Sequence, residues 1–385
     1  MIDPLLINKV WTGLRGSQAL PPSPPVDRAA LEAALAWIDA AWQAARQRGV
    51  SKGYDLLRGS WAPPYPETTG YTIPTLLNAA ELLQRPALQR MALALADFLL
   101  DSATPDGAVV HWQAGQGSEP VIFDTGQVLF GWVAAHRFSK DQRYLDAASR
   151  AGRWLVQQQS ESGSWQKFQH LGVEKVIDTR VAWALLELDA LQPDERLRDA
   201  ARKNLDWACS MQQSDGWFER CSFWEGRDPY THTLAYTAEG LYECGTLLDK
   251  PRYTQAGRLA AEAMLTRQRP DGSLAGTYGP GWSRPASWSC LTGNVQMSRL
   301  WLLLYRDTGE ERFKIAARRA LDFVKRCQDV TSGSLGVRGG ISGSFPVYGG
   351  YERLKYPNWA AKFFADAILA FSALEGQPSA QQYHG

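Results

Sequence analysis

The sequence predicts an all-α protein with an (α/α)6 barrel, in which an outer ring of six helices encloses an inner ring of six. Three features point to this fold: a repeat of about 55 residues, an alternation of amphipathic with all-apolar helices, and a glycine at the same turn of each repeat. An amphipathic helix buries one face, whereas a helix that is apolar on nearly every side must be surrounded by protein. The alternation therefore assigns successive helices to the outer and the inner ring.

The repeat is clearest at the turns that end the outer helices. The turn glycines are Gly107, Gly163, Gly216 and Gly272, at spacings of 56, 53 and 56 residues, and a weaker copy ends at Gly333, 61 residues further on. Glycine fits these positions because a turn that ends a helix commonly needs a positive φ.

Each turn follows an amphipathic stretch with apolar residues at i, i+3, i+4 and i+7, and each precedes a loop and a second, apolar helix. The expected pairs of outer and inner helices are 28–49 with 70–84, 87–102 with 125–138, 142–159 with 179–191, 195–213 with 233–248, 252–268 with 293–306, and 311–328 with 358–374. Short β-hairpins are expected in the loops, at 109–112 and 336–348, and a glycine-rich flap at 339–350. The barrel is thus one domain over 26–376, with an N-terminal arm at 1–25 and a C-terminal tail at 377–385.

Composition excludes several classes of protein. The formal net charge is +1, which argues against a nucleic-acid binder that relies on bulk positive charge. No stretch approaches the ~18 apolar residues of a membrane span, and no basic start followed by an apolar run suggests a signal peptide. We therefore expect a cytoplasmic protein without a membrane span, and the sequence leaves its oligomeric state open.

Metal and nucleotide motifs are absent from the chain. The five cysteines are scattered without a CxxC pair, and the histidines form no HxH or HExxH pattern, so no metal and no cofactor are predicted. No GxxxxGK[ST] loop occurs.

The loops that enter the inner helices meet at one end of the predicted barrel and hold the candidate site. The chain has 16 Trp, 14 Tyr and 13 Phe; core packing explains many of them, and a sugar-binding cleft explains a surplus, because sugar rings stack on indoles. Many aromatic and polar residues fall in these loops, as in a carbohydrate cleft. The candidate substrate-binding residues are Trp61, Tyr65, Gln127, His170, Arg180, Trp224, His232, Tyr236, Trp282, Asn294, Tyr351, Arg353 and Lys362.

Three acids occupy equivalent positions beside threonine at the starts of inner helices: Glu67, Asp124 and Asp178. Helix capping is one explanation for them. Catalysis is the other, because neighbouring inner helices lie roughly 8–10 Å apart, which brings such side chains near the ~5–9.5 Å separation of a glycosidase carboxyl pair. Asp124 and Asp178 are the predicted acid/base pair and Glu67 is a third candidate. Arg180, Arg353, Lys355 and Lys362 are the cations expected to bind a uronate carboxylate.

This plan resembles the six-hairpin glycosidase superfamily, which includes unsaturated uronyl hydrolases, acylglucosamine 2-epimerases and polysaccharide lyases. Two blocks, YPETTGYTIPTLL at 65–77 and YPNWAAKFF at 356–364, resemble a bacterial group of helical-barrel proteins associated with exopolysaccharide systems. The uronyl hydrolases use two inner-helix aspartates from successive hairpins, and Asp124 and Asp178 are similar in placement. Epimerases use paired inner-helix histidines; His232 matches one, but the last inner helix has none.

Terpene cyclases and prenyltransferases also have QxxDGxW-like turns, but this chain lacks their DxDD acid and their zinc set. The resemblance therefore implies a glycoside hydrolase acting on an oligosaccharide or polysaccharide, with chains that contain uronic acid among the candidate substrates. Two alternatives stay open. One is a uronate lyase or epimerase, with His232 or Tyr236 as the base. The other is a non-catalytic carbohydrate-binding protein of an exopolysaccharide system.

Overall fold

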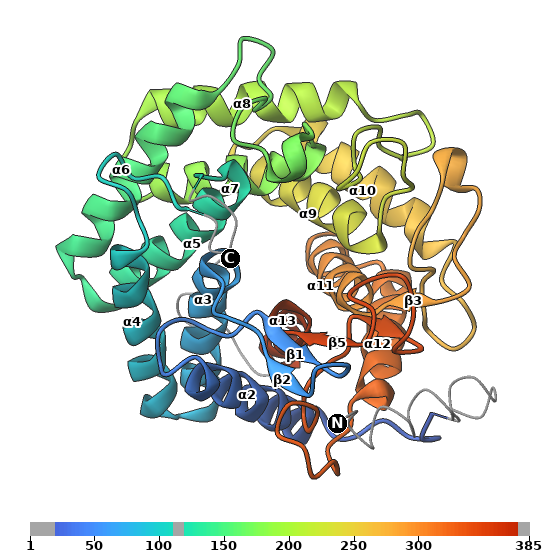
Figure 1. The fold of residues 1–385 in the computed structure, drawn as a ribbon. Helices are drawn as coiled ribbons and strands as arrows, with labels where there is room; N and C mark the ends of the chain where they lie inside the picture. Colours follow the sequence, from blue (N-terminus) through green and yellow to red (C-terminus); the bar gives the residue numbers. More distant parts are fainter. Residues whose placement is uncertain (1–19, 111–118, 376–385) are drawn as a thin grey trace.

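The computed structural model describes residues 20–110 and 119–375, and these residues form the predicted (α/α)6 barrel, seen down its axis in Figure 1. The outer helices are α2 (Asp27–Ala44), α4 (Pro86–Asp101), α6 (Gln142–Gln158), α8 (Glu195–Ser210), α10 (Pro251–Leu265) and α12 (Glu311–Cys327). The inner helices are α3 (Pro66–Leu83), α5 (Ile122–Ser139), α7 (Thr179–Asp189), α9 (Thr231–Leu247), α11 (Leu291–Thr308) and α13 (Asn358–Glu375). Residues 1–19 and 376–385 of the expected arm and tail lie outside the described residues.

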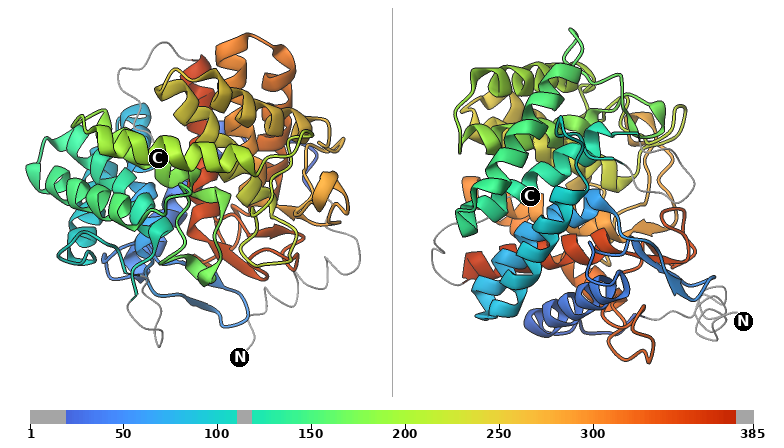
Figure 2. Two further views of the ribbon diagram at one scale, coloured as in Figure 1. Left: turned by 90° about the horizontal axis from the view of Figure 1, so that it is seen from above. Right: turned by 60° about the vertical axis from the view of Figure 1, so that its left-hand side comes forward.

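The inner ring closes on itself, because each inner helix packs against the next and α13 packs against α3. The hairpins are shifted by one helix from the expected pairs. Each inner helix from α3 to α11 packs chiefly on the outer helix that follows it, and α2 covers α13, the last inner helix. The reason is connection length: short turns join inner to outer helices at one end of the barrel, whereas long loops lead back at the other end (Figure 2).

Burial follows the alternation read from the sequence. In α5, every residue from Ile122 to Ala135 is buried, while α12 buries one face and exposes arginines on the other. The inner helices lie between the outer ring and the barrel axis, so an apolar surface on all sides is what their positions require.

The same glutamine contact links four successive pairs of outer helices. At the end of α10, the side-chain amide of Gln268 donates to the carbonyl of Gly272 in its own turn, at 3.2 Å, and to that of Ala316 in α12, at 2.9 Å. The equivalent contacts are Gln159 with Gly163 and Ala200, Gln212 with Gly216 and Ala256, and Gln328 with Gly339 and Ala30. Because Ala30 belongs to α2, the last contact closes the outer ring.

The sixth turn, which follows the sixth outer helix α12, has Gly339 as its turn glycine, and the assignment of that turn to Gly333 is wrong. Gly339 has a φ of +83°, and a Cβ placed on it would lie 2.2 Å from the carbonyl oxygen of Ala33 in α2. At Gly333 an added Cβ would meet nothing within 4 Å. The spacing of the repeat did not predict Gly339, because this turn carries extra residues between its glutamine and its glycine.

The strands are short and lie in the loops, as expected, but with other partners. A hairpin of β1 (Gly53–Asp55) and β2 (Ser60–Trp61) pairs with β5 (Lys355–Pro357), and β3 (Ser289–Cys290) pairs with β4 (Ser344–Phe345). The expected hairpin at 336–348 therefore supplies one strand to another loop. Val109 and Val110 form isolated bridges, and residues 111–112 lie outside the described residues.

The glycine-rich segment 339–350 packs against the molecule, contrary to the expected flap. Its glycines approach the backbone of Ala33 and the ring of Trp37, and further along the side chains of Ser344 and Trp288. Among the described residues, no helix combines the length and the apolarity needed to cross a bilayer.

We expect Gly339→Ala to lower the free energy of unfolding by at least about 2 kcal/mol, because it forces a side chain into a left-handed backbone position and against the carbonyl of Ala33. Gly333→Ala is the matched control and should change stability by less than about 0.5 kcal/mol. Urea denaturation of both variants measures the difference. Equal destabilisation of the two would contradict the assignment of the sixth turn.

Candidate active site

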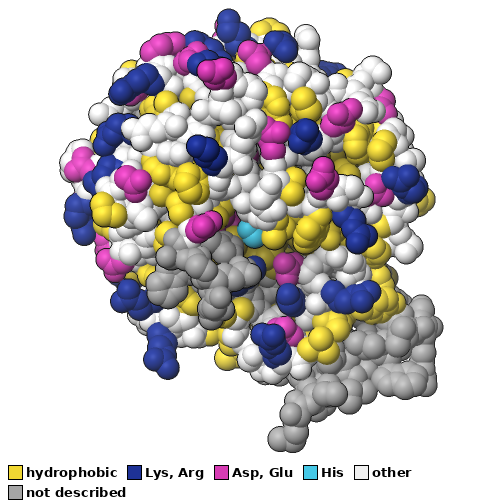
Figure 3. Space-filling view, turned by 45° about the horizontal axis from the view of Figure 1, so that its top comes forward, with side chains coloured by type: hydrophobic (Ala, Val, Ile, Leu, Met, Phe, Trp, Pro, Cys, Tyr) yellow, Lys and Arg dark blue, Asp and Glu magenta, His cyan; other side chains and the backbone are white. Residues whose placement is uncertain are grey.

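The candidate site is a cavity of about 430 Å³ at the barrel end where the long loops meet. Figure 3 shows a hollow on this side of the molecule, with a histidine at its centre and apolar and charged side chains around it. Ten predicted site residues line the cavity: Tyr65, Glu67, Asp124, His170, Trp224, His232, Tyr236, Tyr351, Arg353 and Lys355. Further lining residues include Lys52, Tyr71, Phe123, Gln169, Lys175, Phe223, Tyr230, Glu352 and Trp359.

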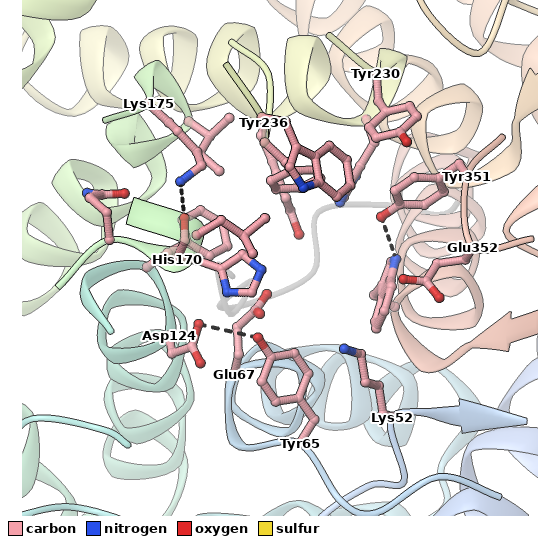
Figure 4. Close-up of a pocket in the computed structure, with 18 of the residues that line it drawn as sticks. Lys52, Tyr65, Glu67, Asp124, His170, Lys175, Tyr230, Tyr236, Tyr351 and Glu352 are labelled. Atoms are coloured by element: carbon pink, nitrogen blue, oxygen red, sulfur yellow. Dashed lines mark hydrogen bonds between the residues drawn. The ribbon is translucent and has the colours of Figure 1, made fainter. Parts of the chain in front are cut away.

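Two carboxyl groups face the cavity from neighbouring inner helices. Glu67 lies in the first turn of α3 and Asp124 in the first turn of α5, and neither occupies the N-cap position, which belongs to Tyr65 and Val121. The Tyr65 hydroxyl lies 3.4 Å from Asp124 Oδ1 and also hydrogen-bonds Glu67 (Figure 4). The tyrosine thus connects the two acids.

The pKa of Glu67 is raised to about 8, chiefly by burial and then by the nearby charge of Asp124, against the opposing effects of Tyr65, Lys52 and Arg180. At neutral pH a carboxyl group with such a pKa keeps its proton. The pair therefore holds a proton donor beside a second carboxyl group, an arrangement from which general acid/base catalysis can be built.

Asp178 stands behind the cavity wall. It occupies the N-cap position of α7 without making a capping hydrogen bond; its Oδ2 accepts from Gln169, which lines the cavity, at 2.7 Å, and its Oδ1 has no hydrogen-bond partner. Burial raises its pKa to about 7, and the ammonium of Lys175 opposes the shift. Capping therefore does not explain this acid, and Asp124 meets Glu67, not Asp178, at the cavity.

His232 is held as a neutral imidazole. Burial lowers its pKa to about 3, and its Nδ1 lies 2.7 Å from Gln296 Oε1, so Nδ1 is the protonated nitrogen that donates to this amide oxygen. Its ring packs against Tyr236, at 4.3 Å between centroids, and against Tyr351, at 5.3 Å. The other ring nitrogen, Nε2, carries no proton and is the atom of this ring that can accept a hydrogen bond.

The cations of the cavity differ in part from those predicted. Arg353 and Lys355 line it as expected, together with Lys52 from the first loop and Lys175. The ammonium of Lys175 donates to the backbone carbonyls of His170 and Val173, and burial lowers its pKa to about 8.

Arg180 and Lys362, the other two predicted cations, lie inside the barrel and do not line the cavity. Arg180 is fully buried, pairs with Glu239 at 2.9 Å and donates to Gln127 at 3.0 Å, so the predicted binding role of Gln127 is replaced by this contact. Lys362 pairs with Asp366 at 2.7 Å. Arg180 is the second residue of α7 and Lys362 the fifth of α13, yet both side chains are used in buried ion pairs and neither lines the cavity.

Trp61, Trp282 and Asn294 also lie away from the cavity. The indole of Trp61 packs on Trp37, and Trp282 donates to the carbonyl of Asp215. Asn294 Oδ1 accepts from the amide of Leu274 and so fixes the turn to α11. Each of the three side chains stabilises the loop in which it lies. The position of a residue in a loop does not distinguish this structural role from substrate binding.

Lys52, Gln169, Glu352 and Trp359 are cavity residues that the sequence did not single out. Lys52 precedes β1, and its ammonium lies 5.0 Å from the Tyr65 ring centroid. A single polar residue just before a short hairpin, such as Lys52, belongs to no recognisable sequence pattern. Trp359 belongs to the YPNW block at 356–359, which gave a sequence signal. Within the described residues no group of three His, Cys, Asp or Glu side chains is arranged to hold a metal ion.

Comparison with known proteins places the fold. A model of the ulvan lyase N-terminal domain matches residues 124–298. The structure of an unsaturated glucuronyl hydrolase from Bacillus sp. GL1 superposes with a TM-score of 0.72 and 16% identity, over 91% of this chain and 97% of that one. Cellobiose 2-epimerase from Bacillus thermoamylovorans gives 0.65 and 15%, over 84% and 89%. The chain therefore has the six-hairpin (α/α)6 barrel of these carbohydrate enzymes, as its sequence indicated.

A curated relative lies in another class. Squalene–hopene cyclase from Alicyclobacillus acidocaldarius is 28% identical over 43% of this chain, and the chain spans 30% of the length of that relative. Terpene cyclases share the QxxDGxW-like turns noted in the sequence. In this structure the glutamines of these turns contact the next outer helix, and none of them lines the cavity.

We expect Glu67→Gln to reduce the pH dependence of stability. Because folding raises the pKa of Glu67, its contribution to stability is complete below pH 4.5, the ordinary pKa, and is lost as pH rises through about 8. The wild-type free energy of unfolding should therefore fall across this window more steeply than that of the variant. Denaturation at several pH values measures it, with Glu81→Gln, an exposed acid on α3, as control. Parallel curves for wild type and Glu67→Gln would contradict the raised pKa.

Proposed function

We propose that this protein is a carbohydrate-active enzyme that hydrolyses a uronic-acid-containing oligosaccharide by general acid/base catalysis. The observation that supports this most is the carboxyl pair Glu67 and Asp124, joined by the Tyr65 hydroxyl in an aromatic-walled cavity. The glucuronyl hydrolase with a similar fold makes the same substrate class the first to test.

In the proposed reaction, protonated Glu67 gives its proton to the glycosidic oxygen as the bond from that oxygen to the sugar carbon breaks. Asp124 takes a proton from a water molecule, whose oxygen forms the new bond to the same carbon. The products are two shorter sugars, and the two acids end with their protonation states exchanged. Asp178 acts in this proposal as a positioning residue, because it holds Gln169 at the cavity wall.

The cations of the cavity supply the recognition of a uronate. Lys52 approaches from the first loop and Lys175 from the third (Figure 4). Arg353 and Lys355 belong to the last loop and also line the cavity. With Glu67 protonated, these four positive groups outnumber the negative charges of Asp124 and Glu352. A sugar carboxylate is the group that compensates this surplus.

Uronate elimination is the second candidate, favoured by the placement of His232 beside Tyr236 and by the family match to ulvan lyase. There, His232 Nε2 would take the C5 proton, the C4–O bond would break to leave a C4=C5 double bond, and Tyr236 would give its proton to the leaving oxygen. A pKa of about 3 makes His232 a weak base for this step. Hydrolysis therefore ranks first.

The test is product analysis by mass spectrometry on a panel of saturated and unsaturated uronate oligosaccharides. Glu67→Gln and Asp124→Asn should each lower kcat by at least ~100-fold, in line with the loss of a general acid or base. Asp178→Asn should have a smaller effect, because the side chain acts through Gln169. Circular dichroism checks that each variant keeps its fold.

The outcomes separate the alternatives. Near-normal turnover by both Glu67→Gln and Asp124→Asn would overturn the pair, and a larger loss in Asp178→Asn would make that residue the catalytic acid. An unsaturated product, abolished by His232→Asn, would establish the lyase. Binding without any product would favour a non-catalytic carbohydrate-binding protein.

A further inference from the structure

A second cavity, of about 640 Å³, adjoins the candidate active site. Its walls come from three successive loops: 159–178 between α6 and α7, 211–230 between α8 and α9, and 266–290 between α10 and α11. Trp224 lines both this cavity and the one that holds Glu67 and Asp124. The two cavities therefore adjoin at this indole, and we call them together the cleft.

Trp224 has the properties of a stacking platform. Its side chain is 47% exposed, although a tryptophan normally buries most of its surface. Phe223 and Tyr230 meet its ring nearly at right angles, at 82° and 77°, and so support it from the protein side. An exposed indole held between two cavities suits a ligand whose apolar face spans both.

The two cavities differ in charge. The second contains Arg220, Arg227 and Arg284 against Glu174, Glu219, Glu225 and Asp228. Ion pairs use up part of these charges, since Arg220 lies 3.3 Å from Glu174, and Arg284 lies 2.8 Å from Asp228. The second cavity thus has no surplus of cations, in contrast to the first, and its mixed charged groups match the hydroxyls of a neutral sugar.

We propose that the cleft binds an oligosaccharide of at least three or four units, with an acidic sugar at the carboxyl pair and neutral sugars beyond Trp224. This inference rests on the proposed function for the first cavity and adds the length and the order of the substrate. The indole stacks on the sugar at the junction, and the second cavity receives the units that follow.

The experiment measures binding by calorimetry, in a Glu67→Gln background that prevents turnover. The probes are oligosaccharides of two, four and six units in which one terminal glucuronate is followed only by neutral glucose units, beside galacturonate oligomers of the same lengths. The tetramer with a single glucuronate should bind at least ~10-fold more tightly than the dimer. Galacturonate oligomers should gain little with length, because their distal carboxylates meet no surplus of cations.

Trp224→Ala should remove the gain of the tetramer with a single glucuronate while changing dimer affinity less than ~2-fold, and Trp224→Phe should retain much of that gain. Trp207→Ala, on the outer helix α8, is the matched control and should change neither.

Equal affinity for dimer and tetramer, or an equal loss for both in Trp224→Ala, would overturn the inference and leave the function proposal standing. An equal gain with galacturonate would overturn the neutral character of the second cavity. If no oligosaccharide of either series binds, the proposed function fails, and this inference fails with it.

Discussion

The contact of each turn with the next outer helix is the constraint on which the rest of the barrel depends. A glutamine amide and a left-handed glycine press one turn onto the backbone of the following helix, and Gln328 and Gly339 apply the same contact to α2. The outer ring is thereby closed at a fixed spacing. The turns before α3 and α5 lack the glutamine contact and rely on glycine packing: Gly49 lies against the ring of Phe98 in α4, and Gly107 lies against the backbone of Arg150 in α6. These close approaches hold the turns that lead to the acids at the starts of α3 and α5.

The interior of the ring holds an unusual amount of charge. Arg180 and Arg299 both pair with Glu239, and Arg180 lies 4.8 Å from the Tyr236 ring centroid, beneath the cavity. Buried ion pairs gain little stability over apolar residues of equal volume, but removal of one partner is costly. The role of this network is therefore to fix the positions of the side chains beneath the cavity, more than to raise the free energy of unfolding.

The sequence predicted the fold nearly completely, because periodicity and turn glycines are properties of single helices and turns. The acids Glu67 and Asp124 were also found, since their neighbours repeat. It did not predict that Arg180 turns inward to Glu239 or that Lys52 reaches the cavity, since both depend on contacts between distant repeats. Asp178 resembles Asp124 in sequence, yet it accepts a hydrogen bond from Gln169, which lines the cavity together with Lys175. The difference lies in the side chains of the preceding loop, whose positions the sequence pattern does not predict.

Closure of the ring also brings the start of the first barrel helix, α2, close to the end of the last barrel helix, α13. One arginine of α12, Arg318, contacts both Asp27 at the start of α2 and Glu375 at the end of α13. The order of the six hairpins around the ring is therefore independent of where the chain opens. A circularly permuted chain joins the end of α13 to the start of α2, next to Arg318, and opens at a short turn such as 309–310. Such a chain keeps the contacts between outer helices, and the end of the barrel that carries the cleft is unchanged.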